Sequence, residues 1–224
     1  MSLRELKCEK YDDILWKSTH FVNGIMKIFS DYTEEIKAKN QGFICVAGVD
    51  EAGCGALAGP VVAGAVVLPF GLILDGVEDS KQLTPKMRGT AFDLIKTSAL
   101  DWATGFASVE EIEKMNIRQA TFLAMRRALS KIKDADFVIV DAWTIPGIPL
   151  SQKAVIRGDQ IVKSISAASI MAKVTRDHLM EAYHKEFPAY GFNKHKGYGT
   201  LSHRLAIKAF GPCEIHRKTY KTFC

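Results

Sequence analysis

Two short apolar runs that each end on an aspartate limit the possible folds of this 224-residue chain more than any other feature. They occupy residues 43–50 (FICVAGVD) and 137–141 (FVIVD), and their β-branched content is typical of buried strands. A third apolar run, residues 61–68, follows the first after a glycine-rich turn. Because stretches with helical periodicity alternate with such runs farther along, the pattern predicts an α/β fold with a mixed sheet flanked by helices.

The remaining elements follow from periodicity and from signals at helix ends. Further strands are expected at residues 102–109 and 154–157, and helices at residues 84–99, 110–132, 161–187 and 201–210. Thr84 and Pro85 suit the N-cap and the first position of a helix. The expected helix at residues 161–187 is rich in serine and alanine, which would let its backbone lie close to a sheet.

Apolar residues also recur at helical spacing near the N-terminus. Residues 3–39 predict two helices interrupted near Asn23 and Gly24. We therefore expect two parts. The first is an N-terminal helical extension (residues 1–40), and the second is one α/β domain with C-terminal helices (residues 41–224). No linker or internal repeat divides the second part.

Positive charge is concentrated at one end of the chain. The net charge is +5, and residues 151–224 hold 13 Lys and Arg against 5 Asp and Glu. Five histidines lie in the same segment, and we interpret them as surface residues or phosphate contacts because their spacing matches no metal-binding pattern. Such a segment suits a polyanionic partner, and a solvated basic surface is the alternative interpretation.

Other features argue against several classes of protein. No apolar run is long enough to span a bilayer and the N-terminus is charged, so we expect a cytoplasmic protein. Five cysteines without a CxxC pair predict reduced thiols rather than disulfides or a zinc site. No GxSxG or Walker A sequence occurs, which argues against the commonest serine hydrolases and nucleoside triphosphatases.

Four carboxylates are candidates for one site. Asp50 and Asp141 end apolar strands, and ligands of open α/β sheets bind beyond such ends. Glu51 can share that site only where the strand ends, and Asp159 precedes the serine- and alanine-rich helix. Clustered carboxylates repel one another unless a divalent cation neutralises them, and oxygen ligands favour Mg²⁺ or Mn²⁺. Two such ions suit phosphodiester hydrolysis by a nuclease, and ordinary turn and cap acids are the alternative.

The glycine-rich turn from Gly53 to Gly59 has two interpretations. A strand followed by GCGALAG approximates a dinucleotide-binding fingerprint, which would indicate an oxidoreductase. That fingerprint must open a helix, whereas Pro60 and another strand follow here. We therefore favour glycines that bring backbone amides close to another backbone or to a phosphate.

A basic loop at residues 193–199 (NKHKGYG) places Tyr198 between two glycines and after two lysines. An aromatic ring in this setting can stack on a sugar or base while the lysines contact phosphates. A nucleic-acid-binding module without catalysis would share this loop, and a solvated loop with a half-buried tyrosine is a further alternative.

Several blocks together resemble the ribonuclease HII family: VDEAGCGALAGPVVAGAVVL, DSKQL, FVIVDA, RGD followed by SISAASIMAKVTRD, and HKGYGT followed by HR. The resemblance implies the ribonuclease H fold, with a five-stranded mixed sheet and flanking helices. It further implies an endonuclease that cuts the RNA strand of RNA–DNA hybrids. At a single ribonucleotide embedded in DNA, such an enzyme cuts on the upstream side and leaves a 3′-hydroxyl and a 5′-phosphate, removing misincorporated ribonucleotides and RNA primers.

The resemblance also implies roles for individual residues. The family's metal-binding acids, which would hold two Mg²⁺ or Mn²⁺ ions with substrate bound, fall on Asp50, Glu51, Asp141 and Asp159. The family's junction-sensing tyrosine falls on Tyr198. We expect a monomer whose partners are RNA–DNA hybrids and ribonucleotide-containing duplex DNA, with no membrane association.

The family's Gly-Arg-Gly turn falls on Gly53, Cys54 and Gly55, and the cysteine is a departure from that pattern. The two glycines can still contact the ribose 2′-hydroxyl through their backbone, but one phosphate contact is lost. Four further cations are candidate phosphate contacts: Lys81, Arg176, Lys194 and Lys196. The tyrosine and the short N-terminal extension favour ribonuclease HII over ribonuclease HIII.

Overall fold

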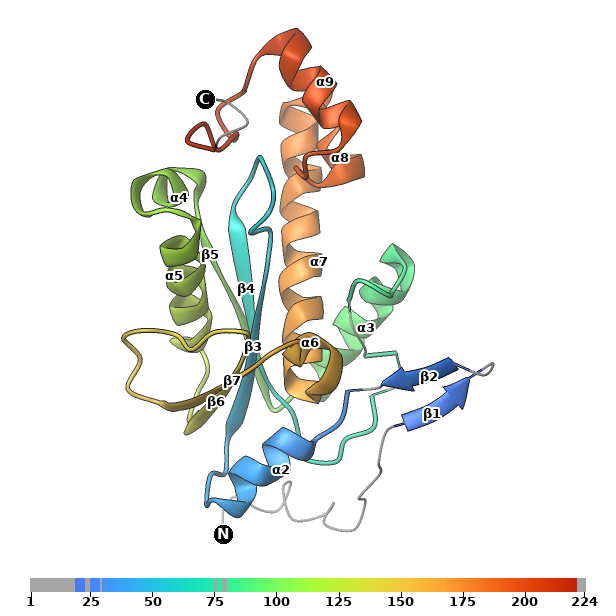
Figure 1. Ribbon diagram of the computed structural model, residues 1–224, viewed down its shortest axis with the longest axis vertical. Helices are drawn as coiled ribbons and strands as arrows, with labels where there is room; N and C mark the ends of the chain where they lie inside the picture. The colour runs from blue at the N-terminus through green and yellow to red at the C-terminus, as the bar shows by residue number, and fades with distance from the viewer. Residues whose placement is uncertain (1–18, 23–24, 29, 75, 78–79, 221–224) are drawn as a thin grey trace.

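A five-stranded sheet forms the centre of the computed structural model, which describes residues 19–22, 25–28, 30–74, 76–77 and 80–220 (Figure 1). Its strands are β3 (Val46–Ala52), β4 (Val61–Val67), β5 (Asp101–Ala107), β6 (Phe137–Asp141) and β7 (Ser151–Val155), in the spatial order β5-β4-β3-β6-β7. β3 and β5 pair antiparallel with β4, whereas β6 and β7 run parallel to β3. The predicted mixed sheet is therefore confirmed.

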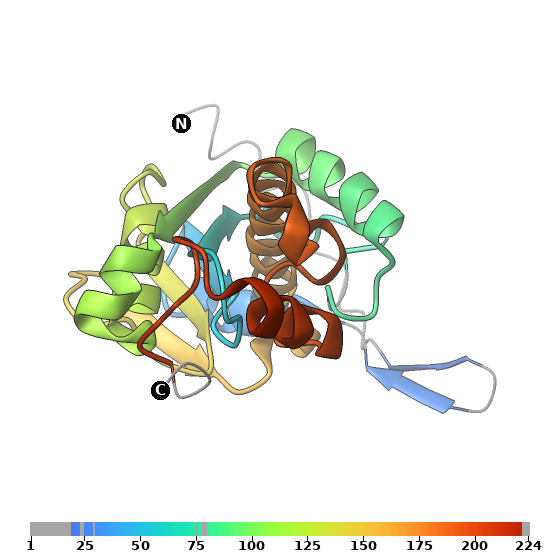
Figure 2. The ribbon, with the colours of Figure 1, turned by 90° about the horizontal axis from the view of Figure 1, so that it is seen from above.

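Helices cover both faces of the sheet. The long helix α7 (Lys163–Glu186) packs on β3 and β4, with α3 (Pro85–Ser98) beside it. On the opposite face lie α4 (Val109–Met115) and α5 (Ile117–Leu129), of which α5 contacts β4 and β5 (Figure 2). The short helix α6 (Gly158–Ile161) precedes α7, and η2 (Pro188–Tyr190), α8 (Phe192–His195) and α9 (Leu201–Phe210) follow it. None of the helices in the described residues is long and apolar enough to cross a membrane.

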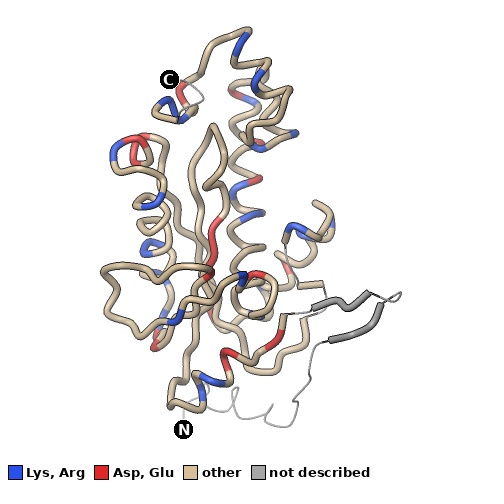
Figure 3. Tube along the Cα trace, viewed as in Figure 1, with Lys and Arg blue, Asp and Glu red and all other residues tan. Residues whose placement is uncertain are grey.

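Basic residues gather on the helices of the C-terminal third. Figure 3 shows Lys and Arg positions along α7 and at α8 and α9, while acidic positions mark β3, against which α7 packs. Lys194, Arg204 and Lys208 are exposed in this region. The basic segment predicted from the sequence therefore contributes surface charge at one end of the molecule, as a polyanionic partner requires.

Two glycines let α7 pack unusually close to the sheet. A Cβ at Gly48 of β3 would lie 2.3 Å from the backbone carbonyl carbon of Ser164, and one at Gly64 of β4 would lie 2.3 Å from the backbone oxygen of Ala168. Cβ atoms do not approach backbone atoms this closely, so only glycine fits at these two positions. The close packing predicted from the serine- and alanine-rich composition of α7 is thus confirmed.

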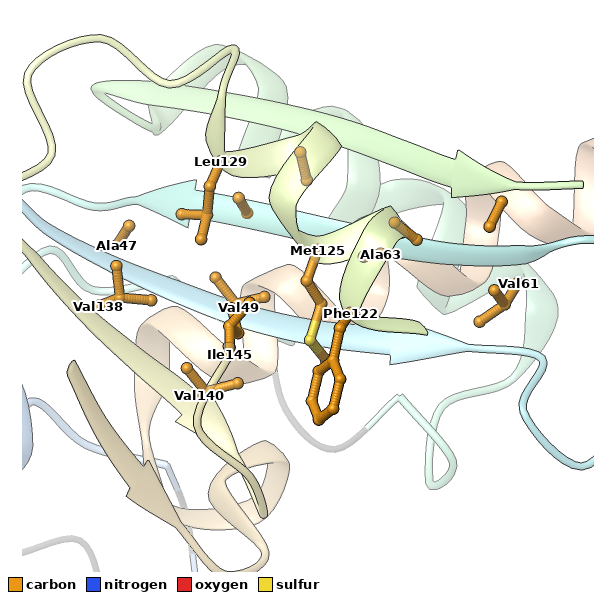
Figure 4. Packing of buried hydrophobic residues seen from close by; sticks show 14 of the residues in the cluster. Ala47, Val49, Val61, Ala63, Phe122, Met125, Leu129, Val138, Val140 and Ile145 are labelled. Carbon is orange, nitrogen blue, oxygen red and sulfur yellow. The ribbon is translucent and has the colours of Figure 1, made fainter. Parts of the chain in front are cut away.

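The larger hydrophobic core lies between the sheet and α5. Figure 4 shows Phe122, Met125 and Leu129 of α5 together with Val49 of β3 and Val140 of β6 in this cluster. Burial of each side chain of this kind contributes roughly 1.5–3 kcal/mol. This packing fixes β3 and β6 relative to each other, and with them the acidic residues that follow their apolar stretches.

The chain departs from the predicted elements where residues adopt a left-handed backbone. The helix expected at residues 110–132 is divided into α4 and α5 at Asn116 (φ 70°), whose side chain accepts a hydrogen bond from the N–H of Gln119. Asparagine tolerates this conformation and is a strong N-cap, which explains the break. The strand expected at residues 154–157 ends instead at Val155, because the chain turns at Arg157 (φ 56°) into α6.

The prediction of helices in the N-terminal extension is wrong for residues 19–28. This segment forms an antiparallel hairpin of β1 (Thr19–Val22) and β2 (Ile25–Ile28), in which Val22 pairs with Ile25. The sequence between the strands is Asn-Gly, the strongest short-range hairpin signal between apolar runs, and it outweighs the helical spacing. Residues 3–18 lie outside the described residues. The helix α2 (Thr33–Asn40) completes this part of the chain, and the boundary after residue 40 stays a prediction.

A buried glutamate joins α2 to the start of α7. Glu35 is 3% exposed, and its carboxylate accepts a hydrogen bond from the backbone N–H of Ser164 at 2.8 Å. The first N–H groups of a helix have no partner within the helix, so this contact caps α7 with a side chain from 129 residues earlier. Burial raises the pKa of Glu35 to about 7, above its ordinary value of 4.5.

We expect Glu35→Gln to raise the free energy of unfolding by on the order of 2 kcal/mol at pH 8 and to change it little at pH 4.5. Because the pKa is higher in the folded state, the folded protein binds more protons between these pKa values, and stability falls as pH rises from about 4.5 to about 7. Glutamine keeps an acceptor for Ser164 without the charge. Urea unfolding at both pH values measures the effect, with the exposed Glu186→Gln as control. Equal effects of Glu35→Gln at both pH values would contradict this account.

Candidate active site

Four acidic side chains lie near the end of the β3–β6 pair. Asp50 and Glu51 belong to β3, Asp141 ends β6, and Asp159 lies in α6. Asp50 and Asp159 are buried, at 5% and 3% exposure, while the other two are half-buried. The four acids that the sequence singles out therefore lie in one region of the structure, where their charges affect one another.

The sheet register places Asp50 beside Asp141 and puts Glu51 on the opposite face of β3. The sequence predicts that this strand ends at Asp50, but β3 continues to Ala52. β3 and β6 pair up to Val49 and Val140, so Asp50 and Asp141 are the next residues on neighbouring strands. Successive side chains of a strand point to opposite faces, so Asp50 and Glu51 lie on the two sides of the sheet beyond the last β3–β6 pair.

Asp141 and Asp159 are linked through the turn into α6. The backbone N–H of Gly158 donates a hydrogen bond to Oδ1 of Asp141 at 2.7 Å. Oδ2 of Asp159 accepts a hydrogen bond from the ammonium of Lys81 at 2.7 Å, and the Lys81 side chain remains 76% exposed. In addition, the hydroxyl of Ser166 in α7 donates to the backbone oxygen of Asp159 at 2.7 Å. The start of α7 thus holds the fourth acid in place beside β6.

The acids perturb one another electrostatically. Burial raises the pKa of Asp50 well above its ordinary value, and the charges of Glu51 and Asp141 raise it further. Burial and the charge of Asp141 likewise raise the pKa of Glu51. The pKa of Asp141 is raised by burial and by the charge of Asp159, against the opposing effect of the Gly158 N–H. The positively charged groups and hydrogen-bond donors around the four acids therefore do not fully compensate their negative charge.

The cluster fits divalent cations by the chemistry of its donors. Among the described residues, no three His, Cys, Asp or Glu side chains converge as a preformed metal-ligand group. The four side chains nonetheless supply only carboxylate oxygens, the ligands that Mg²⁺ and Mn²⁺ prefer, and their raised pKa values show the electrostatic cost that a cation would remove. The ammonium of Lys81 at Asp159 already provides one positive charge at this position.

The glycine-rich turn is held from beneath by a buried arginine. Arg176 of α7 has no exposed surface, and its guanidinium donates to the backbone oxygens of Pro60 (2.9 Å), Ala58 (3.0 Å) and Lys196 (2.9 Å). A Cβ at Gly53, whose φ is +101°, would lie 2.1 Å from Nε of Arg176, so only glycine fits here. The prediction of Arg176 as a phosphate contact is therefore wrong, because its donors are used by the backbone.

A second buried arginine supports the same turn. Arg217 donates to the backbone oxygen of Gly59 at 2.8 and 3.0 Å and to that of Cys54 at 3.0 Å. The chain then continues from Pro60 into β4 rather than into a helix, so the turn cannot serve as a dinucleotide-binding fingerprint. Arg217 lies in the HR block that carries the family resemblance, but its structural role could not be predicted because it depends on the backbone of Cys54 and Gly59, more than 150 residues away.

Tyr198 lies beside the glycine-rich turn. It forms an isolated antiparallel bridge with Ala56, and the backbone N–H of Leu57 donates to the oxygen of Gly197 at 2.9 Å. The guanidinium carbon of Arg176 and the ammonium of Lys173 lie 5.2 and 5.6 Å from the centre of the half-buried ring. The turn and the tyrosine, which are 139 or more residues apart in sequence, thus lie side by side next to α7.

Two buried histidines fix the backbone of Tyr198, which corrects the prediction that they lie at the surface. His203 and His216 have no exposed surface. The N–H of Cys213 donates to Nδ1 of His216, so the Nε2–H of His216 points to Nε2 of His203 at 3.0 Å. Nδ1–H of His203 then donates to the backbone oxygen of Tyr198 at 3.0 Å. Burial lowers the pKa of both histidines to about 4, which keeps this chain of neutral rings intact at neutral pH.

The remaining predicted contacts differ in their exposure. Lys194 is exposed, whereas the side chain of Lys196 is only 16% exposed and donates to Glu181 and to the backbone oxygen of Asn193, both at 2.7 Å. Lys81 and Lys194 are therefore better placed than Lys196 to meet a phosphate.

Cys54 is a protonated, half-buried thiol. Its Sγ lies 3.4 Å from a carboxylate oxygen of Glu51 and 3.1 Å from the hydroxyl of Thr121 in α5. Burial, together with the charge of Glu51, raises the pKa of the thiol to about 12. A thiol in this state is a poor nucleophile, so the side chain acts only by its size and its weak hydrogen bonds.

Comparisons with known proteins agree at the level of sequence and of structure. The family model described as ribonuclease HII matches residues 47–223. A ribonuclease HII from Syntrophotalea carbinolica is 50% identical over 188 residues, which cover 84% of this chain and 90% of that protein. The solved ribonuclease H2 from Pyrococcus horikoshii OT3 has a TM-score of 0.67 and 28% identity, covering 80% of this chain and 95% of its own. Bst-RNase HIII, solved in complex with Mn²⁺, shares the fold, with a TM-score of 0.63 and 19% identity over 80% of this chain and 68% of its own.

Proposed function

This chain belongs to the ribonuclease HII family and is a nuclease acting on the RNA strand of RNA–DNA hybrids, and we propose that it also incises duplex DNA upstream of single embedded ribonucleotides. The products are a 3′-hydroxyl and a 5′-phosphate, and the biological task is the removal of misincorporated ribonucleotides and RNA primers. The observation that supports this proposal is that four acidic residues near the end of the β3–β6 pair influence one another electrostatically, beside a turn and a tyrosine that can contact the sugars of a strand.

Metal binding is the role of the four acids in this proposal: Asp50, Glu51, Asp141 and Asp159. Two Mg²⁺ or Mn²⁺ ions bound by these acids would lower the pKa of the attacking water and stabilise the negative charge on the departing 3′-oxygen. The Mn²⁺ complex of Bst-RNase HIII, a protein with the same fold, supports this class of ion. Ribonucleases HII in general depend on divalent metal.

The other site residues position the strand for in-line attack by water. The exposed ammonium of Lys81, which lies beside Asp159, contacts a phosphate oxygen near the scissile bond. The backbone of Gly53 and Gly55 contacts the 2′-hydroxyl, the group that distinguishes RNA from DNA. The ring of Tyr198 packs on the sugar next to the ribonucleotide, on a backbone that His203 holds. No covalent intermediate with the protein is needed.

The setting of this activity follows from the same features. The described cysteines Cys45, Cys54 and Cys213 are free thiols, which supports a reducing compartment such as the cytoplasm. We further propose that the protein acts as a monomer on its duplex.

The decisive experiment is incision of a DNA duplex carrying one ribonucleotide, beside a long RNA–DNA hybrid, with Mg²⁺, Mn²⁺ or a chelator. We expect metal-dependent cutting upstream of the single ribonucleotide, absent in Asp50→Asn. Cutting of the long hybrid alone would refute the junction activity while leaving the nuclease assignment in place. Binding without any cutting would favour a nucleic-acid-binding module.

Introducing an arginine at the glycine-rich turn is expected to strengthen substrate binding. We expect Cys54→Arg to lower KM about three- to tenfold and to change kcat little. The slope of log KM against log salt should increase by about one, the change that corresponds to one added phosphate contact. The physical reason is that Cys54 contributes no charge between Gly53 and Gly55, where the family has arginine. Steady-state kinetics at two salt concentrations measure this, with Cys54→Ser as the uncharged control. An unchanged KM and salt dependence would show that the turn does not contact a phosphate through this position.

A further inference from the structure

An arginine and a tryptophan form a stacked pair at the edge of the acid cluster. The guanidinium carbon of Arg118, in α5, lies 4.2 Å from the centre of the Trp143 ring, in the loop after β6. Trp143 remains 60% exposed despite this contact. A large aromatic side chain on the surface costs free energy in water, and such residues are enriched where a partner covers them.

A cavity connects this pair to the acids. It has a volume of about 290 Å³, close to the lower end of ligand-binding sites, and Glu51, Cys54, Thr121 and Asp141 line it together with Arg118 and Trp143. Two of the proposed metal ligands and the stacked pair therefore border one space. A strand with its scissile phosphate at these acids would therefore lie beside the space that the pair borders.

Hydrogen bonds anchor the loop that carries Trp143 at both of its ends. The backbone N–H of Trp143 donates to the oxygen of Asp141 at 2.7 Å, and that of Ala142 donates to the oxygen of Val155 at 3.0 Å. Farther along the loop, the N–H of Ile145 donates to the side chain of Gln152 in β7 at 2.7 Å, and that side chain donates to the backbone oxygen of Ile145 at 2.9 Å. The tryptophan is thus pre-organised for binding, which reduces the entropy lost when a partner covers it.

We propose that Arg118 and Trp143 form a substrate-binding subsite for the sugar–phosphate of a nucleotide that flanks the scissile phosphate of the nucleic acid strand. The flat ring of Trp143 packs on the sugar, and the guanidinium of Arg118 contacts the adjacent phosphate. The charges are complementary: the arginine supplies a fixed positive charge next to acids that alone would repel the backbone. This inference rests on the proposed function, because it assumes that the acids hold a phosphodiester.

Steady-state cleavage of the single-ribonucleotide duplex tests the subsite. We expect Trp143→Ala to raise KM about tenfold with kcat changed less than twofold, because the contact is made equally in the ground state and the transition state. Trp143→Phe should recover most of the loss, since it keeps an aromatic face. Arg118→Gln should raise KM and reduce the slope of log KM against log salt by about one. Phe106→Ala, which removes another exposed aromatic side chain on β5, is the matched control.

Direct binding separates this inference from the proposed function. Fluorescence anisotropy of the labelled duplex reports Kd without cleavage when both proteins carry Asp50→Asn. The two proteins compared are Asp50→Asn alone and Asp50→Asn with Trp143→Ala. A Kd about ten times higher for Trp143→Ala supports the subsite, whether or not the wild-type protein cuts the substrate. Failure of the wild-type protein to cut any substrate would refute only the proposed function. A KM and Kd equal to those of Phe106→Ala, or a loss confined to kcat, would overturn the subsite.

Discussion

Asp141→Asn is expected to lower kcat by about a thousandfold or more while the protein becomes more stable in the absence of metal. A factor of a thousand corresponds to about 4 kcal/mol of transition-state stabilisation, a reasonable loss when one carboxylate of a metal-binding set becomes a neutral amide. Stability rises because burial disfavours the charged form of Asp141, and because removing that charge also relieves its repulsion with Asp159 and the β3 acids. The negative charge of Asp141 is therefore expected to increase activity and to decrease stability in the absence of metal.

Thermal unfolding with and without Mg²⁺ or Mn²⁺ checks both parts. In chelator at pH 8, Asp141→Asn should melt above wild type, because the raised folded-state pKa of Asp141 means that its charged form costs stability above that pKa. Added metal should raise the melting temperature of wild type and much less that of the variant. Asp93→Asn, an exposed position on α3, serves as the control. Substantial cleavage by Asp141→Asn, or an equal response of both proteins to metal, would remove Asp141 from the metal site.

Gly64→Ala is expected to destabilise the protein by at least about 4 kcal/mol. The added Cβ would lie 2.3 Å from the backbone oxygen of Ala168, and both groups belong to backbone that cannot rotate away. The clash forces α7 off the sheet, where it covers buried residues of β3 and β4. Because folded domains are stable by only about 5–15 kcal/mol, such a loss leaves a large unfolded fraction at moderate temperature.

Gly89→Ala is the matched control for this prediction. A Cβ at Gly89, within α3, meets no atom within 4 Å, so alanine should stabilise the helix by about 0.5–1 kcal/mol. Urea unfolding of both variants compares the same chemical change with opposite expected signs. If Gly64→Ala unfolded at the same urea concentration as wild type, α7 would not lie as close to β4 as described here.

The strands and the acids could be predicted because their signals are local. β6 has the bounds that its apolar run predicts, and α3 starts at Pro85 after Thr84, whose hydroxyl accepts the N–H of Met87. Asp50 and Asp141 follow apolar stretches of parallel neighbours, and that order along the chain places them at one end of the sheet.

The supporting contacts could not be predicted because they depend on residues far away in sequence. Arg176 is buried, and it donates hydrogen bonds to the backbone oxygens of Ala58 and Pro60, which precede it by more than 100 residues. His203 and His216 contact each other only after α9 and the following loop have folded back. A local signal did exist for the hairpin of β1 and β2, since Asn-Gly lies between its strands, but the helical spacing of the flanking residues obscured it.

Helix α7 links the two halves of the site with a fixed spacing. Ser166, near its start, holds Asp159, and Arg176 holds the glycine-rich turn and the Tyr198 loop. Ten helical residues separate them, about 15 Å, and each inserted or deleted residue would rotate Arg176 by about 100° around the helix axis. A change in chain length within this interval is therefore expected to separate the two halves of the site, whereas a change in a loop outside it would leave their spacing unaltered. The acids and the sugar-contacting surface therefore keep one distance and one relative orientation as long as α7 keeps its length.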